Sequence, residues 1–296
     1  MSTTALPLQA APRAWDYAPS VTAAVSFSAT DILLKILYAD GMDVATLLSL
    51  RGVLVVAFFL AWLRLAPPAR RHDPKQRLIA LGLGLLFAGT MVGLLLAVSL
   101  LPVSIAILAY FIYPLLTGLA GAATGVDRIG WQGLAAALAA FAGLALMLGV
   151  NLSGLAPLGL LAAFAAAFCR VLSLLGTRAY LNGTDARLTT WYAMLPSTAL
   201  FVTASLSFGL WSPPRTSVGW MAFAGVSVGS TLSTLLIYMS TNRIGPFRTA
   251  LVMNLEPMLT ALLSVLLLGE VLSPLQGLGA AVMIAALCTF QFVRGR

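Results

Sequence analysis

The chain has 296 residues, of which 60% are hydrophobic and 9% are charged, and its mean hydropathy is +0.98. Because soluble domains carry about 25% charged residues, this composition excludes the polar surface that a soluble protein needs. We therefore expect an all-α membrane protein, and at about 20 residues per span its length allows about ten transmembrane helices. The net charge of +8 comes from basic residues near the ends of apolar segments, which favours an orientation signal over nucleic-acid binding.

The predicted elements begin after a short tail. Residues 1–17 contain two prolines, Arg13 and Asp16 but no cleavage-like pattern, so we expect a cytoplasmic tail and not a signal peptide. Stretches rich in Gly, Pro, Asp and Asn then separate apolar segments from one another. Ten such segments are expected to be transmembrane helices: 18–38, 44–65, 77–99, 101–123, 129–150, 155–177, 187–210, 218–241, 246–268 and 273–293.

The charges between these segments predict the orientation. Ten spans place both termini on one side of the membrane, and the basic residues then gather on that side. They are Arg13, Arg64, Arg70, Arg71, Lys75, Arg77, Arg128, Arg178, Arg187, Arg243, Arg248, Arg294 and Arg296. The opposite side receives Arg215 with Asp40, Asp43 and Glu270. Since cytoplasmic loops are enriched in Lys and Arg, both termini are predicted to be cytoplasmic.

The chain also repeats itself. AGTMVG at 88–93 resembles AGVSVG at 224–229, and the segment containing Pro114 resembles the segment containing Pro257. Each half, 18–150 and 155–293, holds five spans, so the second would be inserted upside down relative to the first. Inverted repeats are typical of secondary transporters, although two halves rich in Ala and Leu can also resemble each other by chance.

The second half carries a pattern that resembles the EamA family of the drug/metabolite transporter superfamily. The pattern comprises Gly245-Pro246, Glu256-Pro257, Gly269-Glu270, Pro274-Leu275-Gln276 and Gly279-Ala280. The resemblance covers nearly the whole chain and is closest in general appearance to the amino-acid exporters of the YddG type. It implies export of small metabolites or amino acids, while relatives carry nucleotide sugars. The first half departs from the pattern, because Tyr113 stands where a carboxylate would precede Pro114.

Glu256 is the leading candidate for a functional residue. It lies about ten residues into a span, close to the bilayer midplane at about 1.5 Å per residue, where an acidic side chain is costly. Pro257 kinks the helix and frees a backbone carbonyl that Asn254 could satisfy, and Pro114 is the matching hinge candidate. We interpret Glu256 as a proton-binding or amine-binding carboxylate. The alternative is a neutral side chain that hydrogen-bonds to Ser or Thr for helix packing.

Other charged residues lie inside the predicted spans. Arg170 lies deep in the sixth span and cannot lose its charge, so it could bind a substrate carboxylate, pair with Glu256 or extend towards the cytoplasm. Asp31 and Lys35 are four residues apart on one helix face, which favours a structural pair or an outer gate over a binding site. For Arg51 we favour pairing with Asp31 or extension towards the outer surface.

Aromatic, hydroxyl and small residues complete the candidate set. Aromatic rings with hydroxyls suit an amphipathic organic substrate, whereas helix–helix hydrogen bonding is the alternative for each residue taken alone. The substrate candidates are Tyr110, Tyr113, Tyr192, Tyr238, Ser230 and Thr234. Two pairs of small residues at matching positions, Gly89 with Gly93 and Gly225 with Gly229, are predicted to let helices approach closely.

Several functions are not expected. The single histidine, His72, lies in a basic loop, and Cys169 and Cys288 show no metal-ligand or disulfide spacing. We therefore expect no metal site, no cofactor and no enzyme, and we interpret both cysteines as buried small hydrophobic residues. No Walker-type loop is present, so ATP-driven pumping by this chain alone is not expected.

The sequence therefore predicts an exporter of small organic metabolites, with amino acids the first choice, that works by alternating access at a cavity between the repeats. A channel-like facilitator and a transporter of another metabolite class remain alternatives. Only Lys35 and Lys75 of the 17 basic residues are lysines and Ala is abundant, which is typical of a GC-rich bacterial genome and places the protein in the inner membrane. We expect protons as a candidate coupling ion, no nucleic-acid partner, and a monomer or homodimer.

Overall fold

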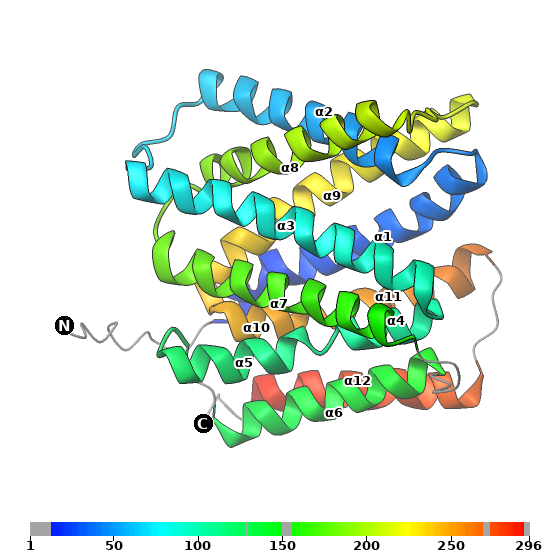
Figure 1. The fold of residues 1–296 in the computed structure, drawn as a ribbon. Helices are drawn as coiled ribbons and strands as arrows, with labels where there is room; N and C mark the ends of the chain where they lie inside the picture. Colours follow the sequence, from blue (N-terminus) through cyan, green and yellow to red (C-terminus); the bar gives the residue numbers. More distant parts are fainter. Residues whose placement is uncertain (1–12, 128–129, 150–155, 269–272, 293–296) are drawn as a thin grey trace.

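The computed structural model describes residues 13–127, 130–149, 156–268 and 273–292. These residues form helices and connecting loops, and none of them lies in a β-strand (Figure 1). The helices are η1 (Ala14–Tyr17), α1 (Ala18–Ala39), α2 (Val44–Leu65), α3 (Pro74–Leu100), α4 (Val103–Tyr110), α5 (Tyr113–Thr124), α6 (Trp131–Leu148), α7 (Pro157–Tyr180), α8 (Ala186–Phe208), α9 (Ser217–Ile244), α10 (Pro246–Val252), α11 (Leu255–Leu268) and α12 (Pro274–Phe292).

Each of the ten predicted apolar segments is helical over most of its described length, with shifts of a few residues at the ends. The start of α3 shows the cause of one shift. Asp73 accepts a hydrogen bond from the Gln76 backbone N at 2.7 Å, and the Gln76 side chain accepts one from the Asp73 backbone N at 3.1 Å. This capping box, with Pro74 at the first helical position, starts the helix three residues earlier than hydropathy alone predicts.

Eight stretches of the described chain are long and apolar enough to cross a membrane. Two of them, 103–124 and 246–267, are the interrupted pairs α4–α5 and α10–α11. Helix α8 is not among the eight because its Ser, Thr and Pro196 lower its hydropathy, and the apolar part of α12, Pro274–Thr289, is shorter. Most of the predicted tail, the pair Gly269-Glu270, and residues 150, 155 and 293 lie outside the described residues.

Both helix pairs are interrupted just before a proline. In the first half the break falls at Phe111 and Ile112, before Tyr113-Pro114, and in the second half at Met253 and Asn254, before Glu256-Pro257. A proline cannot donate a backbone hydrogen bond and is favoured in the first turn of a helix, so each proline opens a new helix and does not merely kink an existing one. The two halves thus share an irregular feature at equivalent positions.

Packing between the halves follows an inverted two-fold relation. Helix α3 packs along α7 and its equivalent α9 packs along α1, while α2 lies against α8 and α6 against α12, each beside its own counterpart (Figure 1). The α6–α12 contact is reciprocal and close. A Cβ atom added to Gly143 would lie 2.7 Å from the Gly279 carbonyl oxygen, and one added to Gly279 would lie 2.5 Å from the Gly143 carbonyl oxygen. Glycine is therefore required on both sides of this crossing.

One pair of equivalent contacts departs from this symmetry. Helix α3 packs extensively against α8, whereas the equivalent helices α2 and α9 touch only slightly. The α3–α8 approach is so close that a Cβ atom at Gly84 would lie 1.9 Å from the Ala193 carbonyl oxygen. The two halves therefore adopt different arrangements of equivalent helices.

The outer surface is apolar, as expected of a chain solvated by lipid. Large hydrophobic side chains such as Leu65, Leu206 and Phe208 are more than 70% exposed, which is unusual for a soluble monomer. The same property corrects one expectation from the sequence, because Cys288 is exposed on α12 and Cys169 only partly buried. In lipid the outward faces of helices are as apolar as the interior, so an apolar neighbourhood in sequence does not predict burial.

Candidate functional site

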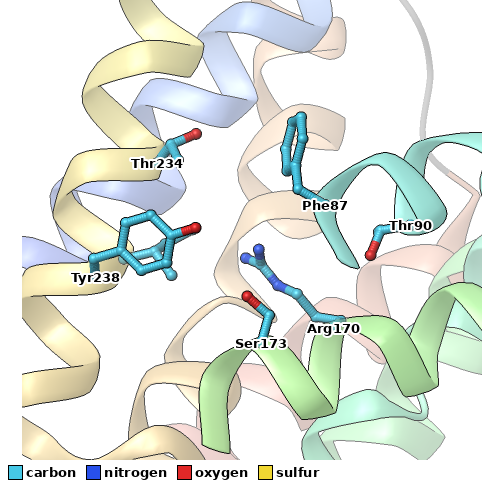
Figure 2. Close-up of a pocket in the computed structure, with 7 residues that line it drawn as sticks. Phe87, Thr90, Arg170, Ser173, Thr234 and Tyr238 are labelled. Carbon is cyan, nitrogen blue, oxygen red and sulfur yellow. The ribbon is translucent and has the colours of Figure 1, made fainter. Parts of the chain in front are cut away.

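A small pocket between α3, α7 and α9 contains the charged side chain of Arg170. Its lining residues are Phe87, Thr90, Arg170, Ser173, Thr234, Ile237 and Tyr238, and we call it the central pocket (Figure 2). The space open to the centre of a water molecule is ≈ 10 Å³, enough for about one water. The central pocket is therefore nearly closed in this conformation.

Arg170 on α7 points its guanidinium group into the central pocket, towards Tyr238 and Thr234 of α9 (Figure 2). Its Cζ atom lies 5.8 Å from the centre of the Tyr113 ring, which is within the range of a cation–π interaction. Tyr110 and Glu256 also lie within electrostatic range of Arg170. The surrounding aromatic rings offer a permanently charged guanidinium a partly polar environment inside an apolar bundle.

No ion pair within 4.0 Å joins Arg170 to a carboxylate of the described chain, and its buried Nε has no hydrogen-bond partner there. The observation bears on the alternatives given for Arg170 only as far as its contacts in this conformation are concerned. It neither pairs directly with Glu256 nor extends to the surface in this conformation, but faces the central pocket. A buried charge without a direct counterion is costly, so its location in the pocket is consistent with a ligand that supplies one.

Glu256 lies in the first turn of α11, directly after the break. The break itself is satisfied by neighbouring polar groups. Asn254, which is 2% exposed, donates its Nδ2 hydrogen to the Leu251 carbonyl at 3.2 Å, and Ser28 on α1 donates its hydroxyl to the Glu256 backbone carbonyl at 2.9 Å. The Glu256 carboxylate makes no hydrogen bond within the described chain. The backbone of Glu256 is thus hydrogen-bonded within the bundle, whereas its carboxylate is available to bind another group.

Asp31 proves to be a neighbour of Glu256. Its Oδ2 atom accepts a hydrogen bond from the Thr260 hydroxyl on α11 at 2.8 Å, and its charge lies within electrostatic range of Glu256. Lys35 donates to the Ser264 hydroxyl at 3.2 Å and also lies within electrostatic range of Asp31. Asp31 and Lys35 are therefore bound to α11, beside the candidate carboxylate.

The spacing of polar residues in α1 and α11 indicates this arrangement. Ser28, Asp31 and Lys35 share one face of α1, and Glu256, Thr260 and Ser264 share one face of α11. Two polar faces in otherwise apolar helices are expected to face each other, because lipid cannot satisfy them. Arg51, by contrast, lies over the Phe87 ring at 5.9 Å and within electrostatic range of Tyr38.

The other predicted residues differ in how they lie relative to the central pocket. The rings of Tyr110 and Tyr113 lie 5.2 Å apart beside Arg170. The Ser230 hydroxyl donates to the carbonyl of Val226 in its own helix, α9, and not to another helix. Tyr192 does not line the central pocket, and its ring lies 5.8 Å from that of His72. Residues of the pocket that the sequence analysis missed are Phe87, Thr90, Ser173 and Ile237.

The predicted small-residue pairs lie at the equivalent contacts α3–α7 and α1–α9. The atoms nearest to an added Cβ are Cys169 Sγ at 3.0 Å for Gly89, the Ala162 carbonyl oxygen at 2.8 Å for Gly93, Leu33 Cδ1 at 2.6 Å for Gly225 and Thr30 Oγ1 at 2.5 Å for Gly229. A side chain at any of these positions would press on the facing helix. Among the described residues no group of three or more His, Cys, Asp and Glu is placed to hold a metal ion.

The fold and the pocket define a helical membrane protein built from two related halves around a central polar site. Comparison with family models matches residues 18–149 and 157–290 to the EamA-like transporter family. The chain belongs to this family, and it is a multi-pass membrane transporter of the drug/metabolite type.

Comparison with solved structures agrees on the fold. A crystal structure described only as that of a protein matches with a TM-score of 0.77 at 21% identity, covering 96% of this chain and 100% of the other. At this identity the likeness shows the fold alone. Comparison with curated proteins found no match.

Proposed function

We propose that the protein is a secondary transporter that exports small organic metabolites, amino acids first among them, across the bacterial inner membrane. The proposal includes ten membrane crossings, cytoplasmic termini, the branch of YddG-type amino-acid exporters, and a monomer or homodimer as the working unit. The family membership and the distribution of basic residues support this reading.

One observation carries the choice of substrate. Arg170 and Glu256 lie within electrostatic range of each other, yet no ion pair within 4.0 Å joins them. A zwitterionic amino acid would complete both groups, with its carboxylate on the guanidinium of Arg170 and its ammonium on the carboxylate of Glu256. The rings of Tyr110, Tyr113 and Tyr238 would contact the rest of the molecule, which favours amino acids with apolar or aromatic side chains.

The asymmetry between the halves supports alternating access. In the proposed orientation α3 and α8 both begin at the cytoplasmic side, so the close contact at Gly84 lies in the cytoplasmic half of the bundle. The equivalent helices α2 and α9 begin at the outer side, and because they touch only slightly the bundle could open there towards the outside. Exchanging the two arrangements would carry the pocket from one side to the other, with Pro114 and Pro257 at the breaks where the helices could bend.

Counterflow tests this proposal against the channel alternative. Purified protein is reconstituted in proteoliposomes that are preloaded with an unlabelled amino acid, and the uptake of the labelled amino acid is measured. A carrier is accelerated by the internal substrate, because its return step is faster when loaded. Uptake that is insensitive to preloading and rises linearly with concentration would indicate a channel, and the absence of uptake across a panel of amino acids would reject the substrate class.

A further inference from the structure

A second cavity of the described molecule lies where the loop between α2 and α3 meets the start of α8. Its volume is ≈ 250 Å³, far larger than that of the central pocket. Arg64, Arg71 and Arg77 line it together with the apolar side chains of Leu60 and Leu63. We call it the arginine cavity. It lies on the side of the bundle where the sequence concentrates basic residues, and nothing in the proposed transport cycle uses it.

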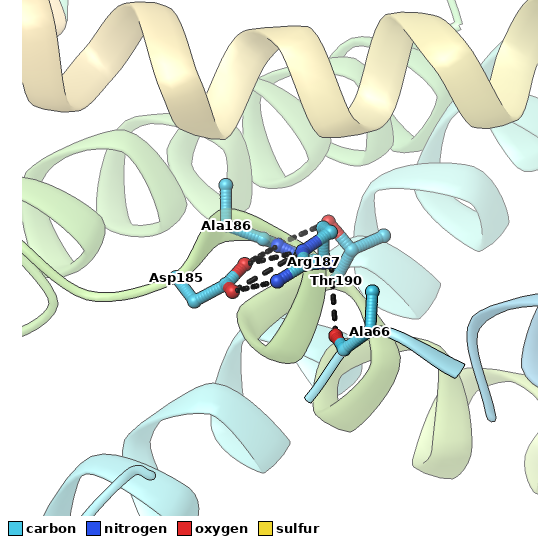
Figure 3. Close-up of polar contacts among 5 residues, drawn as sticks. All are labelled: Ala66, Asp185, Ala186, Arg187 and Thr190. Atoms are coloured by element: carbon cyan, nitrogen blue, oxygen red, sulfur yellow. Dashed lines mark hydrogen bonds and ion pairs between the residues drawn. The ribbon is translucent and has the colours of Figure 1, made fainter. Parts of the chain in front are cut away.

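Hydrogen bonds beside the arginine cavity connect the segments that surround it. Arg187 forms an ion pair with Asp185 at 2.6 Å and donates to the Ala66 carbonyl at 3.1 Å, which ties the loop to the start of α8 (Figure 3). Further along the loop, His72 Nε2 hydrogen-bonds to the Thr189 hydroxyl at 3.0 Å. These contacts hold α2, the loop and the start of α8 together around the cavity.

No carboxylate of the described chain forms an ion pair with Arg64, Arg71 or Arg77, although Arg77 donates its Nε hydrogen to the His72 carbonyl at 3.0 Å. Asp185 is engaged by Arg187, and Asp73 caps α3 through the backbone of Gln76. Neither Arg64 nor Arg71 makes an ion pair or hydrogen bond within the described chain. Guanidinium groups around one cavity repel each other, so a bound anion would stabilise the arrangement. The planar guanidinium fork matches the oxygens of a phosphate group.

The apolar part of the cavity indicates where the anion comes from. Leu60 and Leu63 of α2 contribute apolar side chains to the lining, and Leu65, the last residue of the same helix, is 87% exposed. Trp62 lies in the same turn, and tryptophan is enriched at the membrane–water interface. A phosphate ester attached to acyl chains would meet both parts of this surface, whereas a free phosphorylated solute would meet only the arginines.

We propose that the arginine cavity binds the headgroup of an anionic phospholipid, with the phosphate held by Arg64, Arg71 and Arg77 and the acyl chains along the end of α2. Because the loop of the cavity is tied to α8, and α8 packs against α3, a bound lipid contacts the same helices whose close approach distinguishes the two halves. The inference depends on the chain being a membrane protein and not on the solute that it transports.

Native mass spectrometry of the delipidated full-length protein tests the proposal, with phosphatidylglycerol and phosphatidylcholine added separately. We expect wild-type protein to bind phosphatidylglycerol at least about tenfold more tightly than phosphatidylcholine, since basic residues near an anionic surface each contribute appreciably. The double variant Arg64→Gln/Arg71→Gln is expected to lose about 30-fold in affinity for phosphatidylglycerol, the loss expected for two such residues, and to retain its affinity for phosphatidylcholine.

The matched control is Arg70→Gln/Arg243→Gln, which makes the same change of charge on the same predicted face but outside the cavity. It should bind phosphatidylglycerol like the wild type. Arg64→Lys/Arg71→Lys keeps the charge but lacks the planar fork, so its affinity should lie between those of the wild type and the Gln double variant; it supplies the comparison if the Gln double variant is poorly folded. Equal losses in the cavity variant and the control would overturn the site. Binding of glycerol phosphate or inorganic phosphate as tight as that of the lipid would overturn the lipid as its occupant.

Discussion

Replacing Arg170 tests the substrate site most directly. Arg170→Gln removes the guanidinium that faces the central pocket and leaves a shorter, neutral polar side chain. Because Arg170 has no carboxylate partner within the described chain, its charge is available for a substrate carboxylate. A hydrogen bond to a charged group contributes about 1.5–3 kcal/mol, and each 1.4 kcal/mol corresponds to a factor of ten. The expected loss is therefore about 10- to 150-fold in apparent affinity for an amino acid.

The assay compares an amino acid with its carboxamide in the same proteoliposomes. For the wild type the amino acid should bind more tightly, and for Arg170→Gln the difference between the two substrates should largely disappear. Arg170→Lys should give an intermediate loss, since the ammonium keeps the charge but lacks the planar fork. Arg51→Gln is the control, because Arg51 is an intramembrane arginine that does not line the central pocket. If Arg170→Gln weakens both substrates by the same factor, the residue has a structural role and the reasoning is refuted.

Three further predictions concern other parts of the molecule. Glu256→Gln should abolish transport or remove its pH dependence while leaving a folded protein, measured by uptake at several pH values; unchanged transport at every pH would exclude this carboxylate from the mechanism. Gly279→Ala should destabilise the protein by about 1–3 kcal/mol, measured as a lower Tm, because its Cβ would meet the Gly143 carbonyl oxygen. Gly277→Ala on the same helix is the control and should leave the Tm unchanged, because its Cβ meets no atom within 4 Å. Equal Tm values for the two variants would contradict the packing argument. In the loop before α3, burial lowers the pKa of His72, against the opposing effect of the nearby carboxylates of Asp185 and Asp73. The neutral imidazole is thus favoured in the folded state. Its contribution to stability is therefore present above the unfolded pKa of about 6.5 and declines as the pH falls below that value. In thermal unfolding between pH 7 and 5, His72→Gln should make the fall of Tm with pH less steep, and an unchanged slope would show that other groups cause the fall.

The sequence alone determined the class of protein and the positions of its helices. The scarcity of charge requires lipid as the solvent, and lipid leaves the helix as the way to satisfy an isolated backbone segment. The positions of both interruptions were also evident, but as kinks at Pro114 and Pro257, because a proline lacks the backbone hydrogen-bond donor and this loss is a local property; the structure shows full breaks there. The family resemblance followed from motifs around the second break, and the comparison with family models confirms it.

Only the tertiary structure decided which polar residues meet. Polar residues mark one face of α1 and one face of α11, but other helices carry polar residues too, so the sequence placed Asp31 on α1 and Glu256 on α11 without deciding that these two faces meet. It also suggested Tyr192 for the substrate site, whereas the fold places that side chain beside His72. The close contact of α3 with α8, without an equally close contact of α2 with α9, has no counterpart in the sequence. Such a difference depends on packing across the whole bundle and not on the local sequence of either half.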